Sequence, residues 1–291
     1  MKLQNKNAIV TGGTLGLGRA IVRAFLNEGA SVLFCARDKN AITALQREFA
    51  SSLRAGQKIL GVTCDVSSPE QVNAMFAQFI GEFGALHALV NNAGIYGPKG
   101  PSQTVAWNEW KRTIEINLYG TFVSCRAAIP LMEKNGGGKI VNLSGGGATN
   151  PLPRLSAYAA SKAGVVRLTE TLAEELRDFR IDVNAIAPGP LNTRLLDEVL
   201  EAGPEKVGEG FYKKAIEQAQ RGGVSLEKGA RLCVYLASDA SDGITGKLIS
   251  AQWDSWDSLH THKTDLDSTD IYTLRRITPE DRKRSWSREN A

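Results

Sequence analysis

The sequence has few cysteines and no long apolar run, and each absence excludes a class of protein. The four cysteines lie far apart and without C-x-x-C spacing, which predicts reduced, mostly buried thiols rather than a disulfide framework. Nowhere do about 18 apolar residues follow one another, and the N-terminal residues lead into a predicted strand without an apolar signal region. We therefore expect a cytoplasmic protein without a membrane partner. The cysteines are Cys35, Cys64, Cys125 and Cys233.

The chain also lacks a strong excess of either charge. Lysine and arginine together number 35 against 31 aspartates and glutamates, a formal net charge of +4. The basic residues are scattered except for Arg282-Lys283-Arg284, which we interpret as part of a solvated tail, so the composition indicates no nucleic-acid partner. With 291 residues, 42% of them hydrophobic, the chain is long enough for one large α/β domain or two small ones.

Short apolar runs typical of buried strands alternate with segments that have helical spacing. This alternation predicts an α/β fold with a doubly wound, Rossmann-type parallel sheet of about seven strands and helices on both faces. The expected strands are 7–10, 31–36, 58–63, 88–91, 139–143, 181–187 and 247–251. The expected helices are 40–53, 69–83, 104–133, 158–179 and 226–238.

A glycine-rich stretch follows the first expected strand and precedes a helical pattern. We name residues 12–18, Gly-Gly-Thr-Leu-Gly-Leu-Gly, the Gly-rich turn. Glycines in such a turn let the backbone approach a pyrophosphate, and free N–H groups at the start of the following helix attract its negative charge. Many tight turns look alike, but the order of strand, turn and helix favours dinucleotide binding.

Tyr158 and Lys162 lie four residues apart in a segment that reads as helix. This spacing places a phenol and an ammonium on one helix face. A lysine beside a tyrosine stabilises phenolate over phenol, so we expect the pKa of Tyr158 to fall toward neutrality, where it could exchange a proton. Taken alone, the pair also fits a surface lysine beside a half-buried tyrosine.

Five motifs in order carry a family resemblance: the Gly-rich turn, Asn91-Asn92-Ala93-Gly94, Asn117, the Tyr158/Lys162 pair and Pro188-Gly189. With them, the chain resembles the short-chain dehydrogenase/reductase family from about residue 5 to 250. The resemblance implies an NAD(P)-dependent oxidoreductase that transfers a hydride between the nicotinamide and a carbonyl or secondary alcohol.

The resemblance also implies the catalytic roles. Tyr158 would be the general acid for carbonyl reduction and the base for alcohol oxidation. Lys162 would lower the pKa of Tyr158 and bind the nicotinamide ribose hydroxyls, and Asn117 would hold a water that relays protons from Lys162 to solvent. Asn117 lies in an apolar run, so it could instead be a packed residue at a helix kink.

One position departs from the family pattern. The serine that binds the substrate oxygen usually lies thirteen residues before the tyrosine, and that position is Gly145 here. Ser144 is the nearest serine, and our hypothesis is that it supplies the hydroxyl. The alternative is a site that works with Tyr158 alone plus a water or a backbone donor.

The cofactor-binding set follows from the resemblance as well. The strand at 31–36 ends in Ala36 followed by Arg37, where NAD users of the family commonly have an acidic residue. A guanidinium suits a 2′-phosphate, so we expect NADP to be preferred, with NAD as the alternative cofactor. Arg37 could instead stack on adenine or start the next helix, with Asp38 as its cap. The expected set is Gly12, Thr14, Gly16, Leu17, Gly18, Arg37, Asp65, Val66, Asn91, Ala93, Gly94, Tyr158, Lys162, Pro188, Gly189 and Thr193.

The last hundred residues add two features to this expected domain. Residues 191–223 are helical but rich in glycine, and we interpret them as a mobile substrate lid within a domain that spans 1–251.

Residues 252–291 form a C-terminal extension. Its Trp253 and Trp256 predict docking onto this subunit or a neighbouring one, or a cover for the substrate helix. His260 and His262 could bind a metal, but such tail residues are mostly solvated, and we expect none.

The resemblance further suggests a homodimer or homotetramer built from the helices at 104–133 and 158–179. The substrate is expected to be a small carbonyl or alcohol compound, with a 3-oxoacyl thioester or a sugar as alternatives. A catalytically silent dinucleotide-binding sensor is the competing class. Tyr158, Lys162 and Asn117 argue against that class, because a sensor needs no proton-relay residues.

Overall fold

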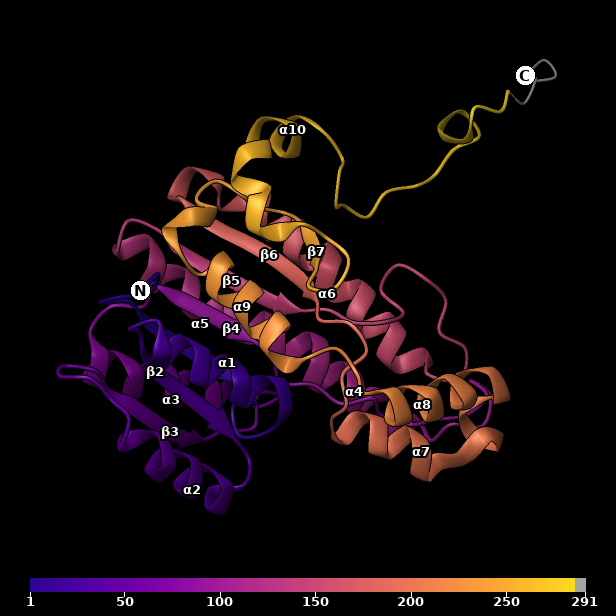
Figure 1. The fold of residues 1–291 in the computed structure, drawn as a ribbon, viewed down its shortest axis with the longest axis horizontal. Coiled ribbons are helices and arrows are strands. Elements are labelled where there is room, and N and C mark those ends of the chain that lie inside the picture. Colours follow the sequence, from indigo (N-terminus) through magenta and orange to yellow (C-terminus); the bar gives the residue numbers. More distant parts are fainter. Residues whose placement is uncertain (286–291) are drawn as a thin grey trace.

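In the computed structural model, which describes residues 1–285, seven parallel strands form one sheet with the order β3-β2-β1-β4-β5-β6-β7 (Figure 1). Every neighbouring pair is parallel. The order reverses between β1 and β4, the switch point at which such sheets bind ligands. The strands are β1 (Asn7–Thr11), β2 (Ser31–Ala36), β3 (Ile59–Thr63), β4 (Ala88–Asn91), β5 (Gly138–Leu143), β6 (Ile181–Ala187) and β7 (Leu248–Ser250).

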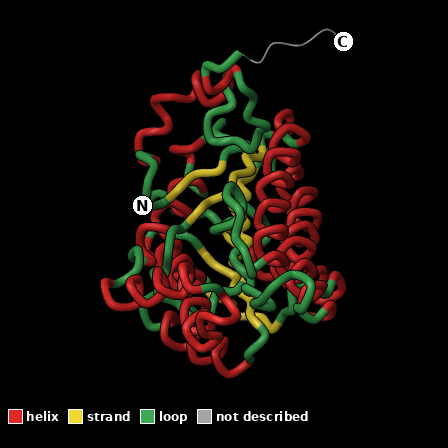
Figure 2. Tube along the Cα trace, turned by 90° about the vertical axis from the view of Figure 1, so that its right-hand side faces the viewer, coloured by secondary structure: helices red, strands yellow, loops and turns green. Residues whose placement is uncertain are grey.

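Helices cover both faces of the sheet, and Figure 2 shows the strands between two helical layers. Side chains alternate along each strand, so Ala8 and Val10 of β1 face the layer of α1, α2 and α9, whereas Ile9 faces the layer of α3, α5 and α6. The expected α/β fold is therefore confirmed. The helices are α1 (Gly16–Asn27), α2 (Lys39–Ala50), α3 (Pro69–Phe83), α4 (Trp107–Ile114), α5 (Gly120–Lys134), α6 (Ser156–Glu175), α7 (Arg194–Val207), α8 (Glu209–Arg221), α9 (Leu226–Leu236) and α10 (Lys263–Ser268).

The helix expected at 104–133 differs from the observed one in two ways. It begins at Trp107, and the five residues Glu115–Tyr119 form a π-helical segment between α4 and α5. Such segments are rare in proteins, and those that occur are often found at functional sites. Asn117 lies within this segment.

The glycine-rich region after β6 forms two helices, α7 and α8, which lie to one side of the sheet (Figure 1). Gly208, with φ 88°, joins them, and Gly203, with φ 76°, kinks α7. Their apolar residues pack mostly on each other: Leu196, Val199, Val207 and Ala215 form a separate small cluster. We call residues 191–223 the lid.

The C-terminal extension packs on the same chain. Leu259 and Leu266 are buried in the cluster that contains α1 and α9. The Trp256 ring lies 6.0 Å from the Tyr235 ring of α9, and its indole N–H donates to the Ala251 carbonyl at 3.3 Å. Trp256 therefore docks on α9 rather than on the lid, whereas Trp253 is 79% exposed.

The cysteines match one expectation from the sequence. All four cysteines are free and buried, as the sequence predicts. Within residues 1–285, no helix has both the length and the apolar character needed to cross a membrane. Over the same residues, no group of three histidine, cysteine, aspartate or glutamate side chains gathers in a metal-binding arrangement.

Candidate active site

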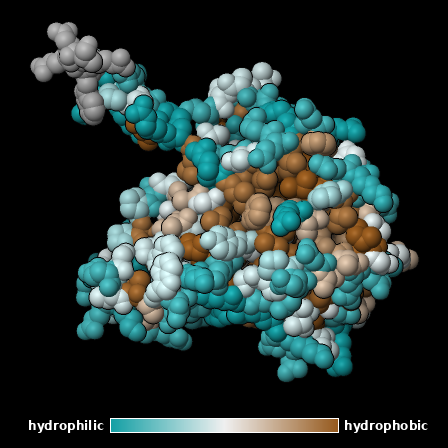
Figure 3. Space-filling view, turned by 180° about the vertical axis from the view of Figure 1, so that it is seen from behind, coloured by the Kyte–Doolittle hydropathy of each residue, from teal (hydrophilic) through white to brown (hydrophobic). Residues whose placement is uncertain are grey.

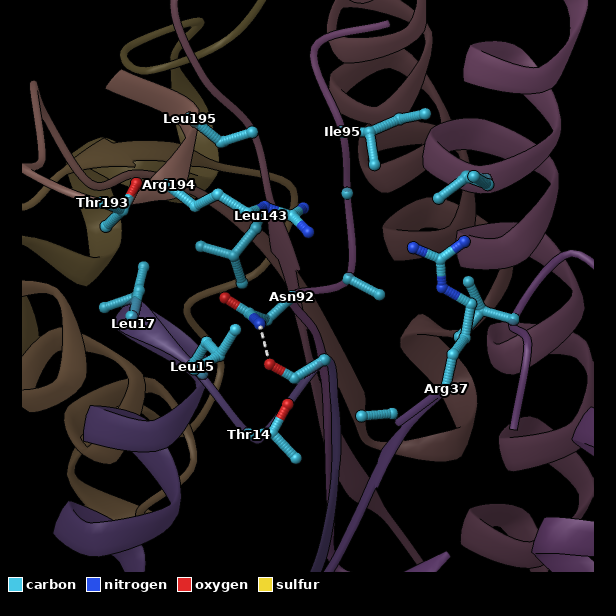
Figure 4. A pocket seen from close by; sticks show the side chains of 18 of the residues that line it. Thr14, Leu15, Leu17, Arg37, Asn92, Ile95, Leu143, Thr193, Arg194 and Leu195 are labelled. Atoms are coloured by element: carbon cyan, nitrogen blue, oxygen red, sulfur yellow. Dashed lines mark hydrogen bonds between the residues drawn. The ribbon is translucent and has the colours of Figure 1, made fainter. Parts of the chain in front are cut away.

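A cavity of about 400 Å³ opens where β1 to β6 end at their carboxyl termini (Figure 4). It lies at the switch point between β1 and β4 and is lined by residues that follow each of these six strands. Most residues expected from the sequence to bind cofactor or substrate line it. They are Gly12, Thr14, Gly16, Leu17, Gly18, Arg37, Asp65, Val66, Ala93, Gly94, Ser144, Tyr158, Lys162, Pro188 and Thr193.

The Gly-rich turn forms one wall of the cavity with geometry that only glycine allows. Gly12 and Gly16 have φ values of 65° and 50°. A Cβ on Gly18 would overlap the Gly12 carbonyl oxygen and lie 2.5 Å from Asn92 Nδ2. Leu15, the N-cap of α1, makes no side-chain cap bond, so the first N–H groups of α1 keep their capacity to bind an anion. This cradle fits the pyrophosphate of a dinucleotide.

Asn92 braces that wall, a role that the sequence analysis did not assign. Its Nδ2 donates to the carbonyl oxygens of Thr11 and Gly12 at 2.9 and 3.0 Å. Figure 4 draws one bond of Asn92 as a dashed line. Thr11 Oγ1 in turn accepts from the backbone N–H of Asn92 and of Ala93, both at 3.1 Å. The end of β4 and the Gly-rich turn are thus one bonded unit.

Two residues of the expected cofactor set do not line the cavity. Asn91 is buried in β4, and its Nδ2 donates to Asn142 Oδ1 at 2.9 Å. Its side chain points into the core because successive strand residues face opposite sides of a sheet. Gly189, with φ 87°, borders Gln252 and Val224 instead. Its conformation shapes the turn before the lid.

Tyr158 and Lys162 lie on one face of α6, as their spacing predicts, and both line the cavity. Lys162 Nζ donates to the Leu143 carbonyl at 2.7 Å and lies 5.8 Å from the centroid of the Tyr158 ring. Burial lowers the pKa of Lys162 to about 8. The lysine is thus mostly protonated at neutral pH, and its pKa of about 8 lies only slightly above that pH.

The pKa of Tyr158 moves in the direction opposite to the expected one. Burial raises it, and the neighbouring Tyr96 phenol, whose ring contacts Tyr158 edge-on at 4.6 Å, raises it further. Desolvation of the phenolate is the largest cause of this rise, and the four-residue spacing alone does not reveal it. Tyr158 is held as a neutral phenol, the form that donates a proton.

Asn117 lies beside the cavity without lining it. Its Oδ1 accepts from the Ile95 N–H, and its Nδ2 donates to the Ile95 carbonyl and to Ser161 Oγ, all at 2.9 Å. The Asn117 backbone carbonyl accepts from Thr121 Oγ1 at 2.8 Å. These bonds tie the π-helical segment to α6 and to the segment that follows β4, and they engage both polar atoms of the Asn117 side-chain amide.

Ser144 and Gly145 occupy the region where the family's substrate-binding serine is expected. Ser144 lines the cavity, is 4% exposed, and its Oγ has no hydrogen-bond partner within residues 1–285. A Cβ on Gly145 would overlap the Tyr158 hydroxyl oxygen and lie 3.1 Å from Tyr158 Cζ. Glycine at 145 thus makes room for the Tyr158 hydroxyl, and a buried hydroxyl with unused bonding capacity lies next to it in sequence.

Arg37, Asp38 and Asp65 line the end of the cavity where the sequence predicts the adenosine of the cofactor. Asp38 caps α2, since its Oδ1 accepts from the N–H of Asn40 and of Ala41 at 2.8 and 3.2 Å. Arg37 is exposed and its side chain extends along the cavity (Figure 4). Asp65 is bonded to Arg112 and, at 2.7 Å, to Ser67 Oγ, so its carboxylate is fixed at the cavity edge.

The lid contributes side chains that the sequence analysis missed. Arg194 and Leu195, at the start of α7, line the cavity with Thr193, and Ile95 faces them from the segment after β4 (Figure 4). No motif marks these positions, because only the packing of the lid against the strand ends brings them to the cavity. One cavity thus brings together the Gly-rich turn and the buried Tyr158/Lys162 pair, the residues from which the sequence predicts a dinucleotide-dependent oxidoreductase.

Comparison with known proteins agrees with that class. The family model "short chain dehydrogenase" matches residues 6–203. A 3beta-hydroxysteroid dehydrogenase of Eggerthella lenta is 38% identical over 245 residues, which cover 84% of this chain and 91% of that protein. A 3alpha-hydroxysteroid dehydrogenase of Mediterraneibacter gnavus is 37% identical, covering 86% of this chain and 96% of that protein. The crystal structure of levodione reductase has a TM-score of 0.78 at 27% identity, covering 89% of this chain and 99% of that one.

The chain belongs to the short-chain dehydrogenase/reductase family. It is an NAD(P)-dependent oxidoreductase that acts on the CH–OH or C=O group of a small-molecule substrate.

Proposed function

We propose that this enzyme interconverts a secondary alcohol and a ketone on an apolar ring, with Tyr158 as proton donor and acceptor. One observation carries the proposal: Tyr158, Lys162 and Ser144 line the same cavity as the Gly-rich turn, with Ile95 and Leu195 also in its wall. Apolar side chains in the cavity wall favour an apolar ring over a sugar or a charged acyl thioester. The hydroxysteroid dehydrogenases among the relatives support the same substrate class.

When bound, the nicotinamide supplies the hydride for reduction or accepts it in oxidation. In the reductive direction, a C–H bond forms at the carbonyl carbon, the π electrons move to oxygen, and that oxygen takes the Tyr158 proton. Lys162 would stabilise the resulting phenolate until Tyr158 regains a proton from solvent, and it would hold the ribose hydroxyls of a bound nicotinamide cofactor. Asn117 has a positioning role, because its hydrogen bonds to Ile95 and Ser161 fix the edge of the cavity beside Lys162.

Ser144 is the proposed second donor to the substrate oxygen. Its buried and unpartnered Oγ gives it the capacity to donate, and Gly145 leaves the Tyr158 hydroxyl room to approach the same oxygen. The loss of such a donor is worth about 2.7 to 4 kcal/mol of transition-state stabilisation. Ser144→Ala is therefore expected to lower kcat by roughly 100-fold or more. Unchanged turnover would assign the role to a water or a backbone N–H instead.

The proposed cofactor is NADP, and Arg37 is the proposed contact to its 2′-phosphate. Asp38 is engaged as the cap of α2, and no carboxylate within residues 1–285 forms an ion pair with Arg37. The kcat/KM for NADPH is expected to exceed that for NADH, and Arg37→Met is expected to remove the difference. A clear NADH advantage in the unaltered enzyme would refute this choice.

We further propose a cytoplasmic homodimer or homotetramer built from the α4–α5 and α6 faces. Tyr119 and Phe122 are 56% and 45% exposed there, and Figure 3 shows apolar side chains gathered on the face seen from behind the sheet. The proposed organisation is a domain at 1–251, which includes the lid, with residues 252–291 as its extension. Light scattering with Phe122→Lys decides the interface: the variant is expected to be monomeric.

The substrate class is tested by the oxidation of NADPH and NADH with a panel of carbonyl compounds. The panel contains a cyclic apolar ketone, an acyclic ketone, an aldose and a 3-oxoacyl thioester. The cyclic ketone is expected to give the highest kcat/KM. A higher value for the aldose or the thioester would reassign the substrate, and no turnover with any of them would contradict the proposed reaction.

A further inference from the structure

The lid begins in direct contact with the Gly-rich turn. A Cβ on Gly16 would lie 3.1 Å from Thr193 Cγ2, so the residue before α7 is a van der Waals neighbour of the residue that starts α1. Thr193 is the N-cap of α7 and, like Leu15 before α1, makes no side-chain cap bond. The first turns of two long helices therefore meet at the same part of the cavity, and both favour negative charge there.

Arg194 adds a full positive charge at this junction. It is the first residue of α7 and lines the cavity, and Figure 4 shows its side chain extending into the space above Asn92. An anion bound on the Gly-rich turn would thus face a guanidinium across the cavity. The guanidinium can bind phosphate oxygens in a bidentate, charge-assisted manner.

Arg194 forms an ion pair with Glu198, and it can give up this partner for another anion. Arg194 Nε lies 3.4 Å from Glu198 Oε1, one helical turn away, and the Arg194 side chain is 56% exposed. Exposed pairs of this kind contribute little stability. Glu198 also binds Lys99 Nζ through Oε2 at 3.2 Å, so it keeps a cation when Arg194 leaves.

We propose that Arg194 binds the pyrophosphate of the cofactor from the lid side, opposite the Gly-rich turn. This contact replaces the ion pair of Arg194 with Glu198. The proposal rests on the cofactor position proposed above. It makes the pyrophosphate a link between the two walls of the cavity, so cofactor binding draws the first turn of the lid inward. Glu198 then remains with Lys99 and keeps α7 attached to the segment after β4.

Calorimetric titration of the full chain with cofactor fragments tests this contact. ADP-ribose carries the pyrophosphate, whereas adenosine 2′-monophosphate lacks it and carries the 2′-phosphate. Arg194→Met is expected to weaken the binding of NADPH and ADP-ribose by about 10- to 100-fold, while adenosine 2′-monophosphate binds within about twofold of the unaltered enzyme. Arg221→Met, at the end of α8, is the matched control and is expected to leave all three affinities unchanged.

The outcomes separate this proposal from the cofactor assignment. If Arg194→Met, with an unchanged melting temperature, binds ADP-ribose as the unaltered enzyme does, the proposal is overturned and the cofactor position stands. A higher KM for the ketone with unchanged cofactor affinity would assign Arg194 to the substrate and also overturn it. Failure of the unaltered enzyme to bind ADP-ribose and NADPH would overturn the cofactor position itself.

Discussion

The two walls of the cavity are held in different ways. The Gly-rich wall is fixed by backbone: Gly12 and Gly18 touch, and Asn92 bonds the turn to the end of β4. The lid wall packs on its own small cluster and meets the rest of the chain through side chains such as the Lys99–Glu198 pair and an Arg154 bond to the Glu205 carbonyl at 2.6 Å. Because the first wall is held by backbone contacts and the second mainly by side-chain contacts, we expect the second wall to move more readily than the first.

The largest effect is expected from an added methyl group in the Gly-rich wall. Gly18→Ala places a Cβ against the Gly12 carbonyl and Asn92, so the turn must open. We expect NADPH affinity to fall by more than about 100-fold and the free energy of unfolding by about 1–3 kcal/mol. Titration and denaturant unfolding measure both.

Gly210→Ala in α8 of the lid is the matched control. A Cβ there meets no atom within 4 Å, so it should stabilise the chain by about 0.5–1 kcal/mol or leave it unchanged. If Gly18→Ala binds NADPH as tightly as Gly210→Ala does, the two walls do not differ as described.

The next effect concerns the space beside Tyr158. Gly145→Ala forces the Tyr158 hydroxyl away from its position, and a displacement of about 1 Å costs about 100-fold in rate. We expect kcat to fall by that factor while the cofactor dissociation constant stays within about threefold. Gly146→Ala, where a Cβ meets nothing within 4 Å, should keep normal turnover. Near-normal kcat in Gly145→Ala would remove the argument for a glycine at this position.

A pH profile tests the charge of Lys162. Its pKa of about 8 lies below the ordinary lysine value because burial disfavours the ammonium. The ammonium is therefore present below pH 8 and lost above it, so kcat for ketone reduction should decline as pH rises through about 8. The residual activity of Lys162→Met should lack this decline. An unaltered decline in the variant would assign it to another group.

The same shift has a consequence for stability. Between pH 8 and the unfolded-state value near 10.4, the unfolded chain binds the proton more tightly than the folded chain. Stability attributable to Lys162 therefore rises with pH across this window. The difference in unfolding free energy between the unaltered enzyme and Lys162→Met should change accordingly.

The smallest effect is expected at the lid. Lys99→Met removes the ion pair with Glu198, in which the Lys99 side chain is only 12% exposed. The ketone KM should rise by about two- to fivefold, with kcat within about twofold, because the lid closes less often. Lys213→Met on the exposed side of α8 is the control. Equal KM values in the two variants would mean that this pair does not hold the lid.

The sequence predicts best the bounds of the strands and helices and the motifs that line the cavity. β2, β4, β6 and α3 begin and end at the predicted residues, because each apolar run is bounded by turn or capping residues. The family motifs also place most cofactor-binding and catalytic candidates in one cavity, as observed. The local sequence pattern is enough to predict those parts of the structure that depend on local backbone geometry.

The remaining features depend on contacts between distant residues. The π-helical segment is tied to Ile95, which lies 22 residues before Asn117 in the chain. The strand register decides that Asn92, not Asn91, meets the Gly-rich turn, and the motif alone does not reveal this. The raised pKa of Tyr158 results from burial, which a four-residue spacing cannot show.

In the proposed mechanism Tyr158 supplies the proton, whereas the cofactor wall of the site does not depend on it. Single-turnover reduction of a cyclic ketone by the NADPH-loaded enzyme tests it, with Tyr158→Phe and, as control, Tyr96→Phe at the adjoining ring. Tyr158→Phe should slow hydride transfer by about 100- to 10,000-fold, with NADPH affinity within about threefold, and Tyr96→Phe should remain within a few-fold of the unaltered rate. A near-normal rate in Tyr158→Phe would contradict the claim.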